Sequence, residues 1–185
     1  MRVLGVDPGS RFCGYGVLES RNNDELIHIE SGCIIPPKSA FSLPLRLKTI
    51  YEGLREVINR CSPEVVAVED VFFAKNAKSA LKLGEARGVA LLAASVSGIP
   101  VCEYAPAKVK LALTGKGRAR KHEVQEMISS ILGISDWKRT DVSDAVAIAL
   151  CHINISPAKE RLGIEIIRPR KRRRRWTEDD FSSEG

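Results

Sequence analysis

The segment Met1–Leu18 constrains the fold of this chain more than any other part of the sequence. An apolar run, Val3–Val6, leads directly to one carboxylate, Asp7, and then to a Pro-Gly turn. A second run of small and apolar residues, Cys13–Leu18, follows at once. We therefore expect two strands joined by a tight turn, with Asp7 at the edge of a sheet, within reach of solvent, a metal ion or a phosphate. An Asx turn before Pro-Gly explains the same residues equally well, so this segment alone leaves the role of Asp7 open.

The rest of the chain alternates between strand and helix patterns. Apolar runs and alternation predict strands at Arg2–Val6, Cys13–Glu19, Leu26–Ile35, Val65–Val68 and Val101–Tyr104. Helical spacing and end signals predict a helix between Ser42 and Ser62, and further helices at Lys78–Ser97, Ala105–Leu113, Val124–Leu132 and Asp141–His152. The first three strands suit an antiparallel meander, whereas the later ones need helical crossovers. This order predicts an α/β fold, a mixed five-stranded sheet with helices on both faces.

Length and charge indicate one domain and a nucleic-acid partner. The 185 residues predict a single domain at 1–155, followed by a basic, flexible tail at 156–185. The formal net charge of +6 is concentrated in Lys108–Lys121 and Arg168–Arg175. Clustered basic residues supply the salt-sensitive attraction to phosphate on which nucleic-acid binding depends. The tail arginines either add DNA affinity or are screened by the neighbouring acids Glu178–Asp180, and this choice stays open.

Other classes of protein are disfavoured by what the sequence lacks. No window reaches the ~20 apolar residues that a membrane span requires, and no secretory signal is recognisable. The five cysteines form no C-x-x-C pair, which favours reduced thiols in a cytosolic setting. The histidines show no metal-ligand spacing, so we expect no zinc site. No Cys or Ser nucleophile with a paired histidine is visible, which disfavours covalent catalysis.

Four carboxylates occupy related positions in the predicted fold. Asp7 ends the first strand and Glu69 ends the first strand after a helical crossover, which can place the two strands side by side. Asp141 and Asp144 lie three residues apart, on one face of the final helix. Acids gathered in this way repel one another and raise some pKa values unless hard divalent cations compensate. Because neighbours in a strand point to opposite faces, we expect Glu69 rather than Asp70 to join the group.

Ordinary explanations and three different functions are compatible with these residues. Asp141 and Asp144 suit a helix cap and an acid that complements the helix dipole, and Glu69 suits a solvated strand end. Two divalent ions held by the acids would suit hydrolysis of a phosphodiester. A nucleotide-binding ATPase of the actin or sugar-kinase type also opens with a strand bearing Asp and Gly, although it needs a duplicated domain. A non-catalytic module that binds DNA junctions would use the basic surface alone.

Four longer motifs closely resemble one family. They are GVDPGSRFCGYGV (Gly5–Val17), VEDVFFAKNAKSALKLGEARGVAL (Val68–Leu91), YAPAKVK (Tyr104–Lys110) and TDVSDAVAIAL (Thr140–Leu150). In this order they resemble the RuvC family of bacterial Holliday-junction resolvases over nearly all of Met1–His152. The resemblance implies a ribonuclease-H-like fold and a cytoplasmic homodimer. It also implies paired symmetric nicks in four-way DNA junctions, in recombination and repair, with the RuvA–RuvB branch-migration complex as a partner.

The same resemblance implies a metal site and several DNA contacts. The metal-binding catalytic set, for two Mg²⁺ ions with Mn²⁺ as a substitute, would be Asp7, Glu69, Asp141 and Asp144. Phe72 matches an aromatic residue at the junction centre that suits base stacking, with core packing as the alternative. Basic residues that contact phosphate in relatives match Lys110 and Lys121. Further DNA-contact candidates are Lys75 and Asn76 in the loop after Phe72, and, on charge alone, Lys116 and Arg118, which a solvated loop explains as well.

Overall fold

The computed structural model describes the backbone of residues 1–21, 25–39, 42–70, 77–134 and 136–161. Within these ranges the chain forms one sheet from β1 (Arg2–Asp7), β2 (Cys13–Ser20), β3 (Leu26–Ile34), β4 (Val65–Glu69) and β5 (Val101–Tyr104). The strand order is β3-β2-β1-β4-β5. The pairs β1–β2 and β2–β3 are antiparallel, whereas β4 lies parallel to both β1 and β5. The predicted meander, crossovers and mixed five-stranded sheet are therefore confirmed.

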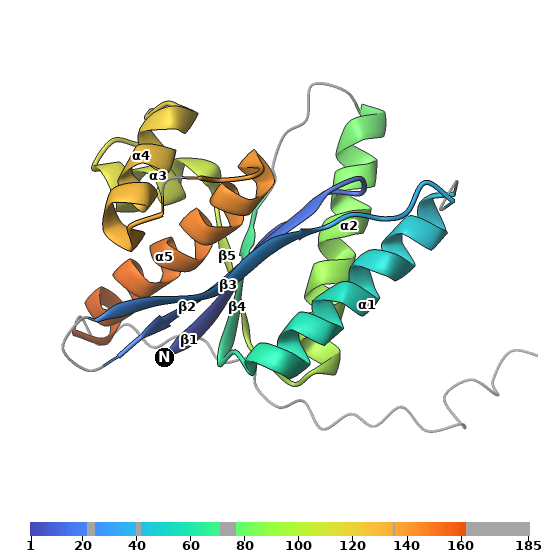
Figure 1. The fold of residues 1–185 in the computed structure, drawn as a ribbon, viewed down its shortest axis with the longest axis horizontal. Coiled ribbons are helices and arrows are strands. Elements are labelled where there is room, and N and C mark those ends of the chain that lie inside the picture. Colours follow the sequence, from blue (N-terminus) through green and yellow to red (C-terminus); the bar gives the residue numbers. More distant parts are fainter. Residues whose placement is uncertain (22–24, 40–41, 71–76, 135, 162–185) are drawn as a thin grey trace, which may run out of the picture.

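Helices cover both faces of this sheet, as expected. The same ranges contain α1 (Leu43–Cys61), α2 (Ala77–Val96), α3 (Pro106–Thr114), α4 (Lys121–Leu132) and α5 (Thr140–Arg161). Figure 1 shows α1 and α2 on one face, and α5 on the other with α3 and α4 beside it. Each helical layer encloses its own apolar core against the sheet. The sheet is thus the middle layer of a three-layer molecule.

Alternation along the central strands decides which side chains enter each core. Val3 of β1 and Ala67 of β4 lie in the core beneath α3, α4 and α5, while Leu4 and Val66 lie in the core beneath α1 and α2. The side-chain period of a strand is two residues. Asp7, four residues after Val3, and Glu69, two residues after Ala67, therefore also fall on the α5 face. This register brings the ends of two parallel strands to the same helix.

Helix α5 lies close to β1 and β2 because glycines face it. A Cβ added at Gly5 would lie 2.0 Å from the backbone oxygen of Ala145, and one at Gly14 would lie 2.0 Å from the backbone oxygen of Asp141. Gly16 is similarly crowded by the helix. Real Cβ atoms do not approach a backbone oxygen so closely, so only glycine fits at these positions. The first turn of α5 is therefore held directly against β2.

Most helix ends follow the predicted signals, with one correction. Helix α1 follows Ser42 and is capped by Ser62, whose φ of 47° is left-handed, and α4 is capped by Gly133 with φ 68°. The prediction that the final helix ends at His152 was wrong, because α5 continues to Arg161. A helix already anchored by packing extends at little cost, and residues 158–161 are strong helix formers. The boundary between domain and tail at residue 155 stays a prediction.

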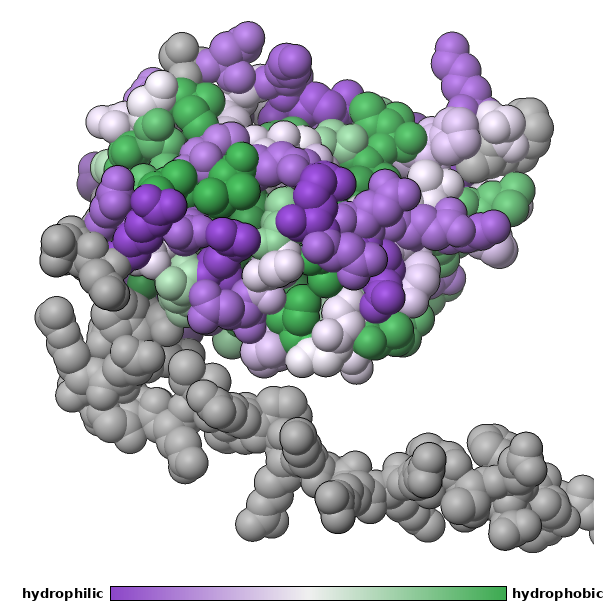
Figure 2. Space-filling view, turned by 60° about the horizontal axis from the view of Figure 1, so that its bottom comes forward, coloured by the Kyte–Doolittle hydropathy of each residue, from purple (hydrophilic) through white to green (hydrophobic). Residues whose placement is uncertain are grey.

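The surface is mixed in polarity. Figure 2 shows the face at the bottom of Figure 1, where separate hydrophobic patches lie among hydrophilic side chains. Among the described residues, no helix combines the length and the apolar character needed to cross a membrane. The largest exposed apolar side chains of α2 are Leu81, Leu92 and Val96. They lie on a different part of α2 from the buried alanines that pack on the core.

Candidate active site

The fold gathers the four predicted acids at one end of the sheet. Asp7 and Glu69 end β1 and β4, which pair in parallel up to Val6 and Val68. Asp7 also pairs with Gly14 of β2, the residue against which the backbone of Asp141 packs. Asp141 and Asp144 are therefore carried to the same sheet end by the first turn of α5. The topology predicted from the sequence is the reason that these residues, far apart in the chain, become neighbours.

Repulsion and burial act together on this cluster. Burial, followed by repulsion from Glu69, Asp144 and Asp141, raises the pKa of Asp7 from 3.8 to about 7. Burial also raises the pKa of Glu69, with repulsion from Asp144 as the next cause. The pKa of Asp144 is raised by burial and by Asp141, although the hydrogen bond and charge of Lys121 oppose the shift. The cluster thus concentrates negative charge at a cost that cations would relieve.

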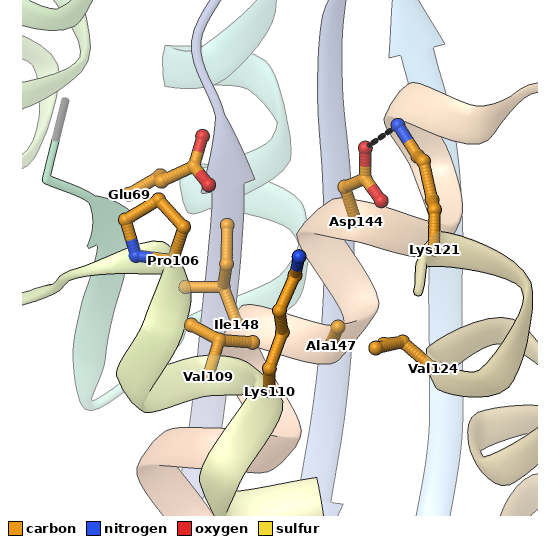
Figure 3. Close-up of a pocket in the computed structure, with 9 residues that line it drawn as sticks. All are labelled: Glu69, Pro106, Val109, Lys110, Lys121, Val124, Asp144, Ala147 and Ile148. Carbon is orange, nitrogen blue, oxygen red and sulfur yellow. Dashed lines mark ion pairs between the residues drawn. The ribbon is translucent and has the colours of Figure 1, made fainter. Parts of the chain in front are cut away.

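A cavity of about 250 Å³ opens between two of these acids. Figure 3 shows Glu69 and Asp144 on opposite sides of its mouth, with Lys110 of α3 and Lys121 of α4 rising between and beside them. Its floor is apolar and is formed by Val109, Val124, Ala147 and Ile148. Two carboxylates and two ammonium groups therefore face one open space. That combination suits an anionic ligand whose phosphate contacts the lysines while the acids hold cations.

Both acids of α5 already have a basic partner. The ammonium of Lys121 forms an ion pair with Oδ2 of Asp144, drawn as a dashed line in Figure 3. Nε of Arg139 lies 3.3 Å from Oδ2 of Asp141, and its guanidinium stacks 3.7 Å from the ring centroid of Phe12. Arg139 and Phe12 were not singled out by the sequence. Their closeness in the chain to Asp141 and Asp7 was the signal that could have found them.

The structure supports the choice of Glu69 over its neighbour. Asp70 faces the opposite side of the sheet, where its Oδ1 lies 3.5 Å from a guanidinium nitrogen of Arg87 on α2. The same guanidinium pairs with Glu103 of β5. Asp70 is thus engaged in a link between α2 and the strand ends, while Glu69 lines the cavity. The alternation of strand side chains separates these adjacent acids as expected.

The structure describes only some of the predicted DNA contacts. Phe72, Lys75 and Asn76 lie outside the described residues. Lys116 and Arg118 are exposed in the loop between α3 and α4, away from the cavity lining. Of the predicted basic residues, the structure brings Lys110 and Lys121 to the acids.

The donor chemistry of the cluster fits Mg²⁺, but its side chains have not converged. Carboxylate oxygens are the ligands that Mg²⁺ prefers in proteins, and all four acids lie near one another. Within the described ranges, however, no three Asp, Glu, His or Cys side chains are placed so that they could hold one ion. The backbone therefore brings the four acids to one sheet end, and two of them, Asp141 and Asp144, pair with Arg139 and Lys121. The buried His152 is hydrogen-bonded to the Tyr104 hydroxyl at 2.8 Å.

Known proteins share this sequence and this fold. The family model of the crossover junction endodeoxyribonuclease RuvC matches residues 3–152. A relative named crossover junction endodeoxyribonuclease RuvC, from Citrifermentans bemidjiense, is 52% identical over 152 residues, covering 82% of this chain and 92% of its own. One of the same name from Trichlorobacter lovleyi is 49% identical over 154 residues, covering 83% and 85%.

Solved structures agree with the sequence comparison. T. thermophilus RuvC, solved in complex with a Holliday junction substrate, superposes with a TM-score of 0.79 at 35% identity, covering 85% of this chain and 96% of that one. The yeast mitochondrial Holliday junction resolvase has a TM-score of 0.62 at 13% identity, which shows a shared fold alone. The ribonuclease-H-like expectation is consistent with both. On the match of residues 3–152 and the identity of its relatives, the chain belongs to the crossover junction endodeoxyribonuclease RuvC family.

Proposed function

We propose that this protein is a divalent-metal-dependent endonuclease that resolves four-way DNA junctions by paired symmetric nicks in recombination and repair. The observation that carries the proposal is the meeting of Asp7, Glu69, Asp141 and Asp144 at one sheet end, in a chain of this family. The adjacent cavity is lined by two lysines as well as by two of the acids. This arrangement suits a phosphodiester, which needs both charge neutralisation and an activated water.

The four acids would hold the cofactor, which we propose to be two Mg²⁺ ions, with Mn²⁺ as a substitute. When bound, such ions supply activation of water and neutralisation of charge on the leaving oxygen. The chain itself contributes the positions of the ligands: Asp7 is held by the end of β1, Glu69 by the end of β4, and the other two acids by α5. Lys110 stands at the cavity mouth, where its ammonium can bind a non-bridging phosphate oxygen of the strand to be cut. The products would carry 3′-hydroxyl and 5′-phosphate ends.

The exposed face of α2 supports a homodimer as part of this proposal. Its outer face carries Leu81, Gly84, Gly88, Leu92 and Val96, spaced three or four residues apart. Leu81, Leu92 and Val96 are 67%, 53% and 56% exposed, and a Cβ at either glycine would meet open space. The opposite face of α2 packs its alanines into the core. A small-residue and apolar stripe of this kind allows two helices to pack closely. A two-fold dimer would place two active sites on a junction that has the same pseudo-symmetry.

The proposed function also includes further DNA contacts and a protein partner. Phe72 would stack on an unpaired base near the junction centre, and Lys75, Asn76, Lys116, Arg118 and Lys121 would contact the DNA backbone. The RuvA–RuvB complex would deliver the junction in the cytoplasm. These assignments extend the family resemblance to particular residues of this chain.

The test is cleavage of a synthetic four-way junction by the full-length protein with Mg²⁺. We expect paired nicks in wild-type protein, and a loss of at least about 100-fold in rate for Glu69→Gln and Asp144→Asn with junction binding retained. Asp70→Asn is the matched control, because Asp70 faces the other side of the sheet, and it should keep most of the activity. Binding without nicks in the wild-type protein would instead support a non-catalytic junction module. Stabilisation by ATP would revive the ATPase interpretation.

A further inference from the structure

The cavity holds an ion pair between a residue of α4 and a proposed metal ligand. Lys121 is the first residue of α4, and its ammonium contacts Oδ2 of Asp144 on α5. Despite the opposing effect of burial, hydrogen bonding to Asp144 and the nearby Asp7 and Asp141 raise the pKa of Lys121. The ammonium is therefore bound by the charge of the whole acidic cluster. It takes up an oxygen that a divalent cation would need.

The exposure of Lys121 makes this contact exchangeable rather than fixed. The Lys121 side chain is 55% exposed, so its flexible stem can swing away without movement of the backbone. Its neighbour Lys110 lines the same cavity, yet among the described residues it forms no ion pair with an acid. In addition, no three acidic, imidazole or thiol groups of the described chain converge on one point. Among the described residues, Lys121 is the basic group that pairs with Asp144, and it occupies an oxygen that a divalent cation would use.

We propose that Lys121 is a displaceable counterion of the acidic cluster, which competes with divalent cations for Asp144. Without metal, its ammonium relieves repulsion among the acids. When a cation is bound, the ammonium is released from Asp144 and faces the mouth of the cavity, where a DNA phosphate lies in the proposed function on which this inference rests. Lys121 is therefore a positioning residue for the cation site as well as a phosphate contact.

The competition predicts an increase in metal affinity when the lysine is removed. We expect Lys121→Met to bind Mn²⁺ about 2- to 5-fold more tightly than wild-type protein, in calorimetric titration without DNA, because an ion pair of this exposure is worth about that much. In EDTA the same variant should melt at a lower temperature than wild-type protein, and saturating Mn²⁺ should close the gap. Lys121→Arg keeps the positive charge and should keep near wild-type affinity.

Lys110→Met is the matched control, because Lys110 contributes charge to the same cavity without pairing with an acid. It should change Mn²⁺ affinity by less than about twofold. Equal or weaker Mn²⁺ binding by Lys121→Met would overturn the inference and leave Lys121 as a phosphate contact only. If wild-type protein showed no Mn²⁺ binding that Asp7→Asn abolishes, the metal site of the proposed function would fall as well. The two failures are therefore distinguishable.

Discussion

Asp7 shows how a single residue can carry function at the expense of stability. It is half-buried, and it faces three other acids. Such a group destabilises the folded chain when it ionises, because the unfolded chain releases the same proton into water without repulsion. The structure tolerates this conflict because α5 and the central strands are held by cores on both sides of the sheet. A trade of this kind is common where a site awaits a charged ligand.

The first prediction concerns pH. The pKa of Asp7 is about 7 in the folded protein, against 3.8 for an aspartate exposed to water as in the unfolded chain. Between pH 3.8 and about 7, Asp7 keeps its proton in the folded state but has lost it in the unfolded state. Stability therefore falls as pH rises from about 4 to 7, by on the order of 4 kcal/mol at most. Glu69 and Asp144, whose pKa values are also raised, act in the same direction.

Urea unfolding in EDTA at pH 5 and pH 8 measures this effect. Wild-type protein should be less stable at pH 8, and Asp7→Asn should lose much of the difference and be the more stable of the two at pH 8. Equal stability of wild-type protein at both pH values would contradict the electrostatic account of the cluster.

The identity of these acids could be predicted, whereas their partners could not. Asp7, Glu69 and Asp141 stand at strand ends and a helix start, which short-range patterns reveal. The pairing of Lys121 with Asp144, and the stacking of Arg139 on Phe12, depend on where whole elements lie in space. Lys121 was therefore predicted only as a phosphate contact.

At the scale of elements, the position of α5 depends on residues that have no side chain. The glycines of β1 and β2 leave a flat surface on which the small residues of α5 lie, and this contact fixes two of the four acids. Element order and strand topology were predictable, because apolar periods and turn residues are local signals. The closeness of α5 to the sheet was not predictable, because a glycine in a strand is equally compatible with a bulge or a bend.

The second prediction tests this contact. Gly14→Ala places a methyl group against the Asp141 backbone oxygen, so α5 must shift at its first turn. We expect a loss of about 1–3 kcal/mol in unfolding free energy and a larger proportional loss of metal-dependent cleavage. Gly117→Ala is the control, because its Cβ would come no nearer than 3.4 Å to another atom, at Ala107. Full stability and activity in Gly14→Ala would show that α5 does not need this close approach.

The two helical layers of the molecule have different surfaces. The layer of α3, α4 and α5 carries the acidic and basic groups of the cavity, whereas the layer of α1 and α2 carries the exposed apolar stripe. Arg87 connects α2 to the strand ends through Asp70 and Glu103. A dimer formed through α2 would thus leave both cavities open to DNA. The active layer and the association layer were not separable from the sequence, since the close packing permitted by the small residues of α2 suited either the sheet or a second subunit.

The third prediction tests the association layer. If the proposed dimer forms through α2, Leu81→Glu with Leu92→Glu should convert it to a monomer in sedimentation velocity, because charged side chains would be buried without partners in the interface. The monomer should stay folded, since both leucines are more than half exposed. Leu111→Glu on α3, at a position of similar exposure, is the control and should leave the dimer intact. An unchanged sedimentation coefficient in the double variant would place the interface elsewhere.

The last prediction concerns the basic run Arg168–Arg175, in which every residue except Pro169 is Lys or Arg. Each phosphate that a protein neutralises on duplex DNA contributes about −0.9 to the slope of log affinity against log salt concentration. Replacing these basic residues with Gln should therefore flatten the slope by several units. The change should be equal for linear duplex and four-way junction, because a run of positive charges contacts the phosphate backbone and does not recognise the branch point.

The acids Glu178–Asp180, which follow the basic run, could instead neutralise its charge within the chain. If they screen the arginines within the chain, the Gln variant will leave the slope unchanged, and neutralising the three acids in the wild-type background will steepen it. The ratio of junction to duplex cleavage should not change in either variant, because the proposed function assigns that selectivity to the domain that carries the four acids. A change in this ratio would show that the tail helps to recognise the junction itself. Phosphate contacts by charged residues alone do not supply such recognition.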